Sequence, residues 1–192
     1  IIPIHNHLDL TQSCLASLLL HRSDIAFEVI VVDDASTDGS LAFLSGINGL
    51  RLFCMPEQSG YVLACNKGAS EARGKMLVFL NNDTIVQAGW LDALLDLFDR
   101  FPDTGIAGAK LFYPNGVLQE AGGAIFNDGS VWNTGRFEQA DNARFNYVRE
   151  VDYVSGATLA IRKKIFEQLK GFDTHFAPGY FEDTDLAMRV RA

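Results

Sequence analysis

The sequence predicts an α/β fold in three layers, Rossmann-like, with a mainly parallel central sheet. Over the first hundred residues, short β-branched runs alternate with longer amphipathic stretches, which is the order of βαβ units. The runs EVIVVDD and KMLVFLNND are apolar on both faces until their last residues, as expected of central parallel strands covered on both sides. Their acidic residues therefore fall at the carboxyl edge of the sheet, where open α/β sheets bind ligands.

Hydrophobic periodicity and turn signals give the elements of the first half. The predicted strands cover residues 1–4, 27–32, 50–55, 76–80 and 106–111. The predicted helices cover residues 8–20, 39–45, 61–72 and 89–101. Arg73 and Gly74 fit a helix C-terminus with a left-handed glycine, and Pro102 ends the helix before it.

The character of the sequence changes from about residue 112. YPNG, AGGAIFNDGS and NTGR contain Asn-Gly, Asp-Gly and Gly-Gly pairs, which predict hairpins or irregular loops in place of further βαβ units. The block YVSGATLAIRKKIFEQLKGFD then predicts a strand followed by a short helix that Gly171 closes. A loop with glycine and proline leads from there to the acidic sequence FEDTDLAMR.

Size and composition bound the class of protein. The 192 residues suit one domain, and 48% apolar residues suffice for a substantial core. A net charge of -8 without a run of Lys and Arg argues against a nucleic-acid surface, which needs clustered basic side chains. Three cysteines without a Cys-x-x-Cys pair suggest neither a zinc ribbon nor a disulfide scaffold, so a reducing cytoplasm is the simplest compartment.

The ends of the chain point to a piece of a longer protein. The sequence opens inside an apolar strand, IIPI, and stops in DLAMRVRA, which resembles the middle of a helix. We therefore expect residues 1–192 to be a single domain trimmed at both ends. No signal-peptide pattern is present at the start, and no apolar stretch approaches the roughly 20 residues that span a bilayer.

Two adjacent acids, Asp33 and Asp34, end the second strand. The polar residues that follow, ASTDGS, can cap the next helix, and one of the two acids can do the same. The other acid then needs a cation or a ligand rich in hydrogen-bond donors. In SGYVLACNKG, a helix opens at a glycine, so its free N–H groups could meet an anion, although Gly60 could equally form only a turn.

The run FLNNDT places Asp83 after the fourth predicted strand, beside Asn81 and Asn82. The residues could form no more than a turn, because Asn and Asp tolerate left-handed conformations. They could also bind a metal, since magnesium is commonly held by one or two protein carboxylates together with substrate phosphates and water. A diphosphate would then supply the negative charge that a second carboxylate would otherwise provide. Asn82 would contribute to the ligands around the metal through its carbonyl or a water.

FEDTDL concentrates three carboxylates, Glu182, Asp183 and Asp185. One interpretation is a charged helix start, because acids are favoured at helix N-termini. The other is a general base, because neighbouring carboxylates raise one another's proton affinity.

Taken together, the segments IIPIHN, VVDDASTDGS, SGYVLACNKG, FLNNDT, YVSGATLAIRKKIF, GFD and FEDTDLAMR resemble family 2 glycosyltransferases in order and spacing. The form Asn-Asn-Asp-Thr and the segment LQEAGGAIFNDGS are most similar to the bacterial branch that includes rhamnosyltransferases of cell-wall and surface polysaccharides. The resemblance implies the GT-A fold, a nucleotide-diphosphate sugar donor of the UDP or dTDP type, a divalent metal (Mg²⁺ or Mn²⁺) and inversion at the anomeric carbon. It also implies a glycan or lipid-linked acceptor and a location in the cytoplasm or at the inner membrane face.

The resemblance assigns roles to residues of the donor site. Pro3 and His5 match the Pro-x-Tyr-Asn segment that lines the nucleoside pocket in the family, with His5 in place of the tyrosine. Asp34 would contact the base or ribose, with Asp33 beside it. Asp83 matches the metal-binding Asp of the family's Asp-x-Asp motif, in which Asn81 and Asn82 replace acids found in many members.

The resemblance also assigns the reacting groups. Asp183 matches the catalytic base, with Glu182 as its neighbour and Asp185 in a structural role. Ser155 and Gly156 fall in a stretch that approaches the donor sugar or the acceptor in relatives. Family members usually complete the metal site with a later histidine, beyond the last residue of this chain.

Two other functions are compatible with parts of the sequence. A non-catalytic nucleotide-sugar binding module would fit the reduced Asn-Asn-Asp motif. A nicotinamide-dependent oxidoreductase would also use such a sheet, but no Gly-x-Gly-x-x-Gly follows the first strand.

Overall fold

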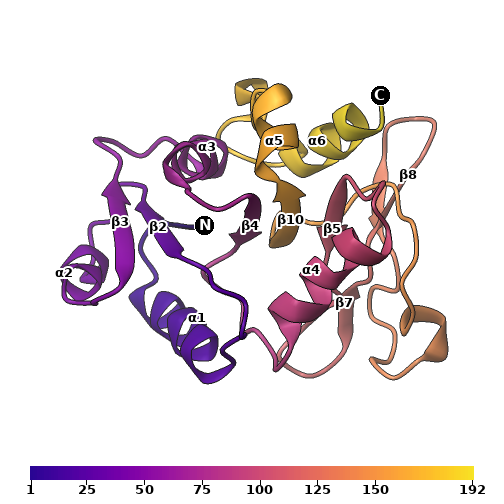
Figure 1. Ribbon diagram of the computed structural model, residues 1–192, viewed down its shortest axis with the longest axis horizontal. Coiled ribbons are helices and arrows are strands. Elements are labelled where there is room, and N and C mark those ends of the chain that lie inside the picture. The colour runs from indigo at the N-terminus through magenta and orange to yellow at the C-terminus, as the bar shows by residue number, and fades with distance from the viewer.

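The computed structural model describes residues 1–192, and its central layer is a sheet in two three-stranded halves (Figure 1). The first half has the order β1 (Ile2–Ile4), β2 (Val29–Asp33), β3 (Leu50–Cys54). The second has the order β4 (Met76–Leu80), β10 (Thr158–Arg162), β5 (Ile106–Gly108).

The sheet is mainly parallel, as the sequence predicts. β1, β2 and β3 pair in parallel, whereas β10 pairs antiparallel with both β4 and β5. Ile1 joins the two halves: its N–H donates to Val78 O at 2.8 Å, and its carbonyl accepts from Leu80 N at 3.0 Å. Val78 and Leu80 are the two neighbours of Phe79, and one residue that bonds to both neighbours of its partner is the pattern of a parallel pair. Of the six strands, only β10 therefore runs in the opposite direction to the others.

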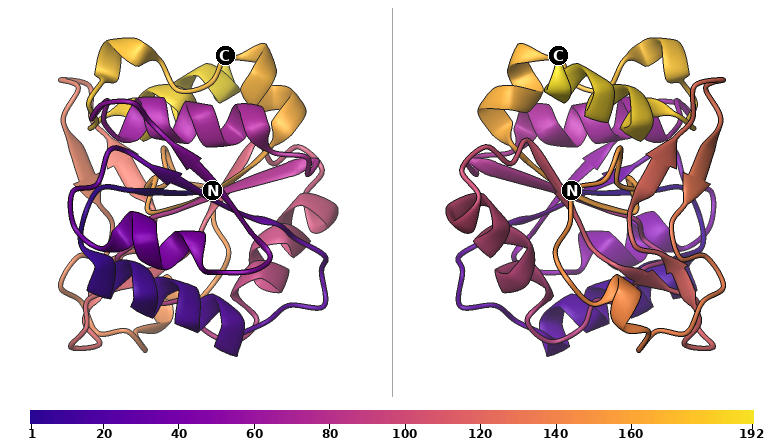
Figure 2. Two further views of the ribbon diagram at one scale, coloured as in Figure 1. Left: turned by 90° about the vertical axis from the view of Figure 1, so that its left-hand side faces the viewer. Right: turned by 90° about the vertical axis from the view of Figure 1, so that its right-hand side faces the viewer.

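Helices cover both faces of this sheet, which gives the three layers (Figure 2). One face carries α1 (Leu8–Leu20), α2 (Ser40–Ser45) and α4 (Trp90–Arg100). The other carries α3 (Tyr61–Glu71), α5 (Lys163–Gln168) and α6 (Glu182–Arg191).

The alternation of side chains along β2 explains the two apolar cores. Ile30 and Val32 belong to the core under α3, α5 and α6, while Val31 belongs to the core over α1 and α2. Both faces of the strand are buried, which is why EVIVVDD reads as a continuous apolar run.

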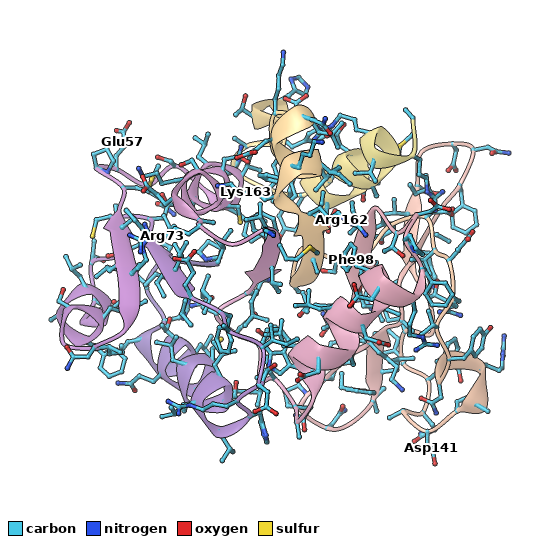
Figure 3. All side chains as sticks on the ribbon, viewed as in Figure 1. Glu57, Arg73, Phe98, Asp141, Arg162 and Lys163 are labelled. Atoms are coloured by element: carbon cyan, nitrogen blue, oxygen red, sulfur yellow. The ribbon has the colours of Figure 1, made fainter.

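Arg162, the last residue of β10, ties the antiparallel strand to the loop after α4 (Figure 3). Its guanidinium donates to Thr104 O at 2.6 Å and to Phe98 O at 3.2 Å, and lies 4.9 Å from the centre of the Phe98 ring. The same side chain therefore satisfies two backbone carbonyls and packs on an aromatic face.

The second half of the chain forms small hairpins, as its turn residues predict. β6 (Leu111–Phe112) pairs with β7 (Leu118–Glu120), and β8 (Gly123–Ile125) pairs with β9 (Val131–Asn133). Two short 3₁₀ helices follow, Ala143–Phe145 and Thr174–Phe176.

Most predicted boundaries hold to within one or two residues, with two corrections. The predicted strand 106–111 is two strands, because β5 pairs with β10 whereas Leu111 pairs with Glu120 in a separate hairpin. The predicted left-handed Gly74 is also wrong: α3 ends at Glu71, Ala72 is already extended, and Gly74 has no positive φ. None of the helices is long and apolar enough to cross a membrane.

Candidate functional site

A pocket of about 250 Å³ opens at the carboxyl ends of β1, β2 and β4. Its lining residues come from four segments of the chain that are distant in sequence. They are Pro3, Ile4, His5, Asp34, Gly60, Tyr61, Ala64, Asn81, Asn82 and Asp83. The acids that follow two separate strands therefore share one pocket, as expected for the switch point of an open α/β sheet.

Asp34 is held by the backbone at the start of α3. It is 4% exposed, and its two oxygens accept from the N–H groups of Ser59 and Gly60, both at 2.7 Å. The chain itself therefore supplies two hydrogen-bond donors to this carboxylate, and such bonds to a charged acceptor are strong. The same bonds take up N–H groups that could have met an anion at this helix.

Asp33 and His5 fix the backbone around Asp34. Asp33 Oδ1 accepts from Ser36 N at 2.9 Å, so it caps the turn after β2. His5 Nδ1 lies 2.7 Å from the carbonyl of Asp34, and since a carbonyl only accepts, this nitrogen carries the proton. The imidazole thus joins the ends of β1 and β2 on the floor of the pocket, beside the buried Pro3.

The three residues after β4 all line the pocket but differ in their contacts. Asp83 is exposed and lines the pocket. Asn82 also lines it, but its amide donates to Thr11 Oγ1 of α1 at 3.0 Å. Asn81 Oδ1 is buried and has no hydrogen-bond partner. An orphaned buried oxygen is costly, so it marks a place where a ligand, ion or water completes the structure.

The residues at this edge fit a divalent metal only in company with other ligands. The chain has no group of three or more His, Cys, Asp and Glu side chains that could hold a metal ion. The exposed carboxylate of Asp83 and the orphaned oxygen of Asn81 are the hard donors that Mg²⁺ and Mn²⁺ accept. Such an ion would take its other ligands from water and from phosphate oxygens.

Asp183 borders the pocket through a short chain of contacts. Its Oδ2 accepts from Gly156 N at 3.0 Å and its Oδ1 accepts from Thr184 N at 2.6 Å. The carbonyl of Gly156 accepts from the hydroxyl of Tyr61 at 2.9 Å, and Tyr61 lines the pocket. Asp34 and Asp83 therefore share the pocket, while Asp183 is not among its lining residues and is linked to it through Gly156 and Tyr61.

Glu182, Ser155 and Asp185 support this region in different ways. Glu182 is 6% exposed, burial raises the pKa of its carboxyl, and its Oε2 has no hydrogen-bond partner. Ser155 Oγ accepts from Ala157 N at 3.2 Å, which shapes the loop before β10. Asp185 pairs with Arg189 one turn later at 2.6 Å, so its structural assignment agrees with its contacts.

Two residues near the site were not assigned a role from the sequence. Tyr61, at the first position of α3, links the pocket to Gly156. Glu120, the last residue of β7, is 3% exposed, and burial raises the pKa of its carboxyl to about 7. The available signal for Glu120 was its place as the only acid in the short segment VLQEAGG. An acid that such a segment buries is expected to have a partner or a function, because an unpaired charge is rarely buried.

A larger and shallower hollow of about 450 Å³ lies along α4. It is lined by Ile25, Asp92, Ala93, Leu95, Asp96 and Asp99. It has no residue in common with the pocket at the strand ends, and two of its acids have partners of their own, Ser23 for Asp92 and Arg100 for Asp96.

Comparison with known proteins identifies the family. The sequence profile described as Glycosyl transferase family 2 matches residues 1–170. The chain belongs to this family. Its fold is accordingly the GT-A fold that the resemblance implies.

The relatives of this family 2 member include an O-antigen biosynthesis protein and a rhamnosyltransferase. The chain is 30% identical over its whole length to the O-antigen biosynthesis protein RfbC of Myxococcus xanthus, of which it covers 16%. Over 92% of its length it is 28% identical to the N-acetylglucosaminyl-diphospho-decaprenol L-rhamnosyltransferase of Mycobacterium tuberculosis, of which it covers 64%. The chain thus spans less than two thirds of the length of these relatives.

Solved structures share the fold over nearly the whole chain. GalNAc-T7 with UDP, GalNAc and Mn²⁺ has a TM-score of 0.78 at 16% identity, covering 98% of this chain and 39% of that one. The mannosyltransferase PcManGT from Pyrobaculum calidifontis, with GDP-Man and Mn²⁺, has a TM-score of 0.67 at 20% identity, covering 98% and 50%.

Proposed function

We propose that residues 1–192 form a single catalytic domain that moves a sugar, with inversion, from a nucleotide-diphosphate sugar to an acceptor hydroxyl. The observation that carries this proposal is the shared pocket of Asp34 and Asp83 at the carboxyl edge of the sheet, with Asp183 at its border. Membership of glycosyl transferase family 2 supports the reaction class.

The donor nucleotide would occupy the floor of the pocket. Pro3 and His5 present the end of β1, and Asp34 presents a carboxylate that fixes the start of α3. Asp33 holds the turn beside it. A carboxylate oxygen has more than one lone pair, so Asp34 can still accept from a base or a ribose hydroxyl while it binds the backbone.

Asp83 would hold the divalent cation, with Asn81 and Asn82 also in the lining of the pocket. Bound there, Mg²⁺ or Mn²⁺ would supply positive charge to the diphosphate leaving group. Two of the solved structures with this fold contain Mn²⁺ with a nucleotide or nucleotide-sugar, which supports the choice of ion.

Asp183 would act as the general base. In a single in-line displacement, the acceptor oxygen attacks C1 of the sugar as the bond from C1 to the diphosphate oxygen breaks. Asp183 Oδ1 or Oδ2 takes the hydroxyl proton, and the nucleoside diphosphate leaves. Gly156 N and Thr184 N fix the plane of its carboxylate, and Glu182 is its buried neighbour. Ser155 and Gly156 would face the donor sugar or the acceptor.

We further propose a donor of the UDP or dTDP type and a glycan or lipid-linked acceptor in cell-wall or surface polysaccharide synthesis. Relatives named as a rhamnosyltransferase and as an O-antigen biosynthesis protein support this direction. The reaction would take place in the cytoplasm or at the inner face of the membrane. It would involve no nucleic acid.

One observation favours the alternative of a non-catalytic nucleotide-sugar binding module. Both oxygens of Asp183 already accept hydrogen bonds from the chain itself. Catalysis by Asp183 would require these bonds to rearrange when the substrate binds, as catalytic hydrogen bonds often do.

Nucleotide release tests the choice directly. The full-length protein is incubated with UDP-glucose or dTDP-rhamnose, Mn²⁺ and a membrane glycolipid extract, and the free nucleotide and the anomer of the product are measured. Transfer with inversion is expected for the wild type. Asp183→Asn should lower the rate of transfer by a factor of about 10² or more and leave the affinity for the donor nearly unchanged. Binding without turnover would favour the module, and an Asn variant of normal rate would remove Asp183 as the base.

A further inference from the structure

Glu120 and Asp183 hold adjacent peptide groups of the same loop. Ser155 N donates to Glu120 Oε1 at 3.3 Å, and the next N–H, that of Gly156, donates to Asp183 Oδ2 at 3.0 Å. Glu120 lies in β7 and Asp183 in α6, so two carboxylates from distant parts of the chain converge on one dipeptide.

The dipeptide has little freedom to move away from either carboxylate. A side chain at Gly156 would place its Cβ 2.8 Å from the Tyr61 hydroxyl, which shows how closely α3 packs on it. The Gly156 carbonyl accepts from that hydroxyl, and Ser155 O accepts from Thr158 N at the start of β10. The loop is therefore clamped between α3, β10, Glu120 and Asp183.

We propose that Glu120 is a positioning residue: by holding Ser155 N it sets the Gly156 N–H against Asp183 and so fixes the direction of the Asp183 carboxylate. The role of Asp183 as the base rests on the function proposed above. Glu120 itself touches neither donor nor acceptor in this account.

The buried state of Glu120 makes the clamp sensitive to pH. Burial raises the pKa of this carboxyl to about 7; the hydrogen bond from Ser155 N opposes the shift and the charge of Asp183 adds to it. A charged carboxylate accepts a stronger hydrogen bond than a neutral carboxyl. The bond to Ser155 N is therefore stronger above pH 7 than below it.

The other titratable groups around Glu120 have partners of their own. The hydroxyl of Tyr153 donates to Asn133 Oδ1 at 2.8 Å. Arg149 donates to the carbonyl of Ala121, and Lys110, which precedes the strand partner of Glu120, binds the carbonyl of Ala140 and the side chain of Asn146. None of the three makes a hydrogen bond or an ion pair with Glu120, which leaves the Ser155 amide as its partner.

The test uses the amide signals of Ser155 and Gly156 in the full chain, followed by NMR from pH 5.5 to 8.5. In the wild type, both amide proton shifts should change with one midpoint near pH 7, because both peptides belong to the same clamp. Glu120→Gln keeps the side-chain shape and an accepting oxygen but cannot ionise, so both inflections should vanish. Glu138→Gln, an exposed acid in the same half of the chain, should leave both unchanged.

Two NMR results would overturn the proposal. One is a Gly156 signal that stays flat while Ser155 titrates, since the link would then stop before Asp183. The other is an inflection near pH 7 that persists at Gly156 in Glu120→Gln. Neither result depends on whether the protein transfers a sugar.

Kinetics provide the second readout. With UDP-glucose or dTDP-rhamnose and Mn²⁺, Glu120→Gln should lower kcat about 3- to 10-fold and leave KM unchanged, because misdirected bases act on the transition state. An unchanged kcat in a variant that has lost the amide inflections would also overturn the proposal. If the wild type turns over neither donor, the proposed function fails, and the amide titration still decides the link between Glu120 and Gly156.

Discussion

The two halves of the chain hold their site residues by different means. In residues 1–108, Asp34 and Asp83 follow regular strands, and the order of the strands places both acids at one edge of the sheet. In the second half, Ser155 and Gly156 lie in a loop outside the strands, and bonds to Glu120, Asp183 and Tyr61 place this loop. Strand ends thus provide the pocket, and tertiary contacts provide its border.

Helix α3 and the glycine before it make several tertiary contacts with the second half. Tyr61 donates to Gly156, Asn66 exchanges two hydrogen bonds with the backbone of Phe172 at 2.8 and 2.9 Å, and Gly60 packs against Pro178. Figure 1 shows α3 beside α5 in the same layer. We infer that a substitution at the start of α3 lowers the free energy of unfolding more than a similar substitution elsewhere, because it breaks contacts between the two halves.

The largest effect is expected for Gly60→Ala. Gly60 has a φ of +89°, and a Cβ there would lie 2.5 Å from the Pro178 side chain and 2.6 Å from its backbone. The substitution should lower the free energy of unfolding by about 3 kcal/mol or more, from strain and overlap together. Gly49→Ala is the matched control, since Gly49 has a φ of +86° with open space around it and should lose only about 1 kcal/mol. Equal losses in urea unfolding would show that the α3 contact contributes nothing.

The next effect is a pH dependence of stability that comes from Glu120. Its pKa is raised to about 7 in the folded chain, so the folded state holds a proton that the unfolded state has released above pH 4.5. Stability should therefore fall as pH rises from 4.5 to 7, by up to about 3 kcal/mol from this group. Glu120→Gln cannot ionise and so lacks this pH-dependent contribution. The free energy of unfolding of the variant should therefore rise relative to that of the wild type between pH 5 and 8. A constant difference in urea unfolding across that range would contradict the buried acid.

Asp34→Asn should have a smaller effect, of about 2 kcal/mol. The amide keeps one acceptor oxygen but turns an NH₂ group toward one of the two N–H donors, those of Ser59 and Gly60. The loss should appear as a lower melting temperature together with faster hydrogen exchange at the start of α3. Normal exchange there would show that Asp34 does not hold this helix.

The smallest effect is expected for Asp185→Asn. Asp185 and Arg189 are one turn apart on α6 and partly exposed, and such pairs contribute below about 1 kcal/mol. Transfer by this variant should equal that of the wild type, in contrast with Asp183→Asn two residues earlier. A large loss of transfer without loss of stability would place Asp185 in the reaction.

The sequence predicts the first half well because its periodicity carries the information. Strands that are apolar on both faces require helices on both sides, and acids at their ends then share one edge, as Asp34 and Asp83 do. The partner of Asp34 could not be predicted, since the two amides that hold it belong to residues 59 and 60, far along the chain.

The second half is less predictable for a physical reason. Its turn residues predict hairpins, but they do not say which side chains the hairpins bury. Glu120 occupies a strand of three residues, too short for any period to show, and only its packing reveals the raised pKa. Gly74 teaches the converse: a glycine after a helix is favoured at a left-handed position but does not require one.

The central claim is that Asp83 joins the chain to a pyrophosphate through a divalent cation. Calorimetric titration of UDP, with and without Mn²⁺, into wild type and Asp83→Ala tests it most directly, with the distant exposed Asp141→Ala as control (Figure 3). Mn²⁺ should tighten UDP binding at least about tenfold, roughly 1.4 kcal/mol, in the wild type and in Asp141→Ala, and not in Asp83→Ala. An equal response to Mn²⁺ in all three proteins would contradict the account.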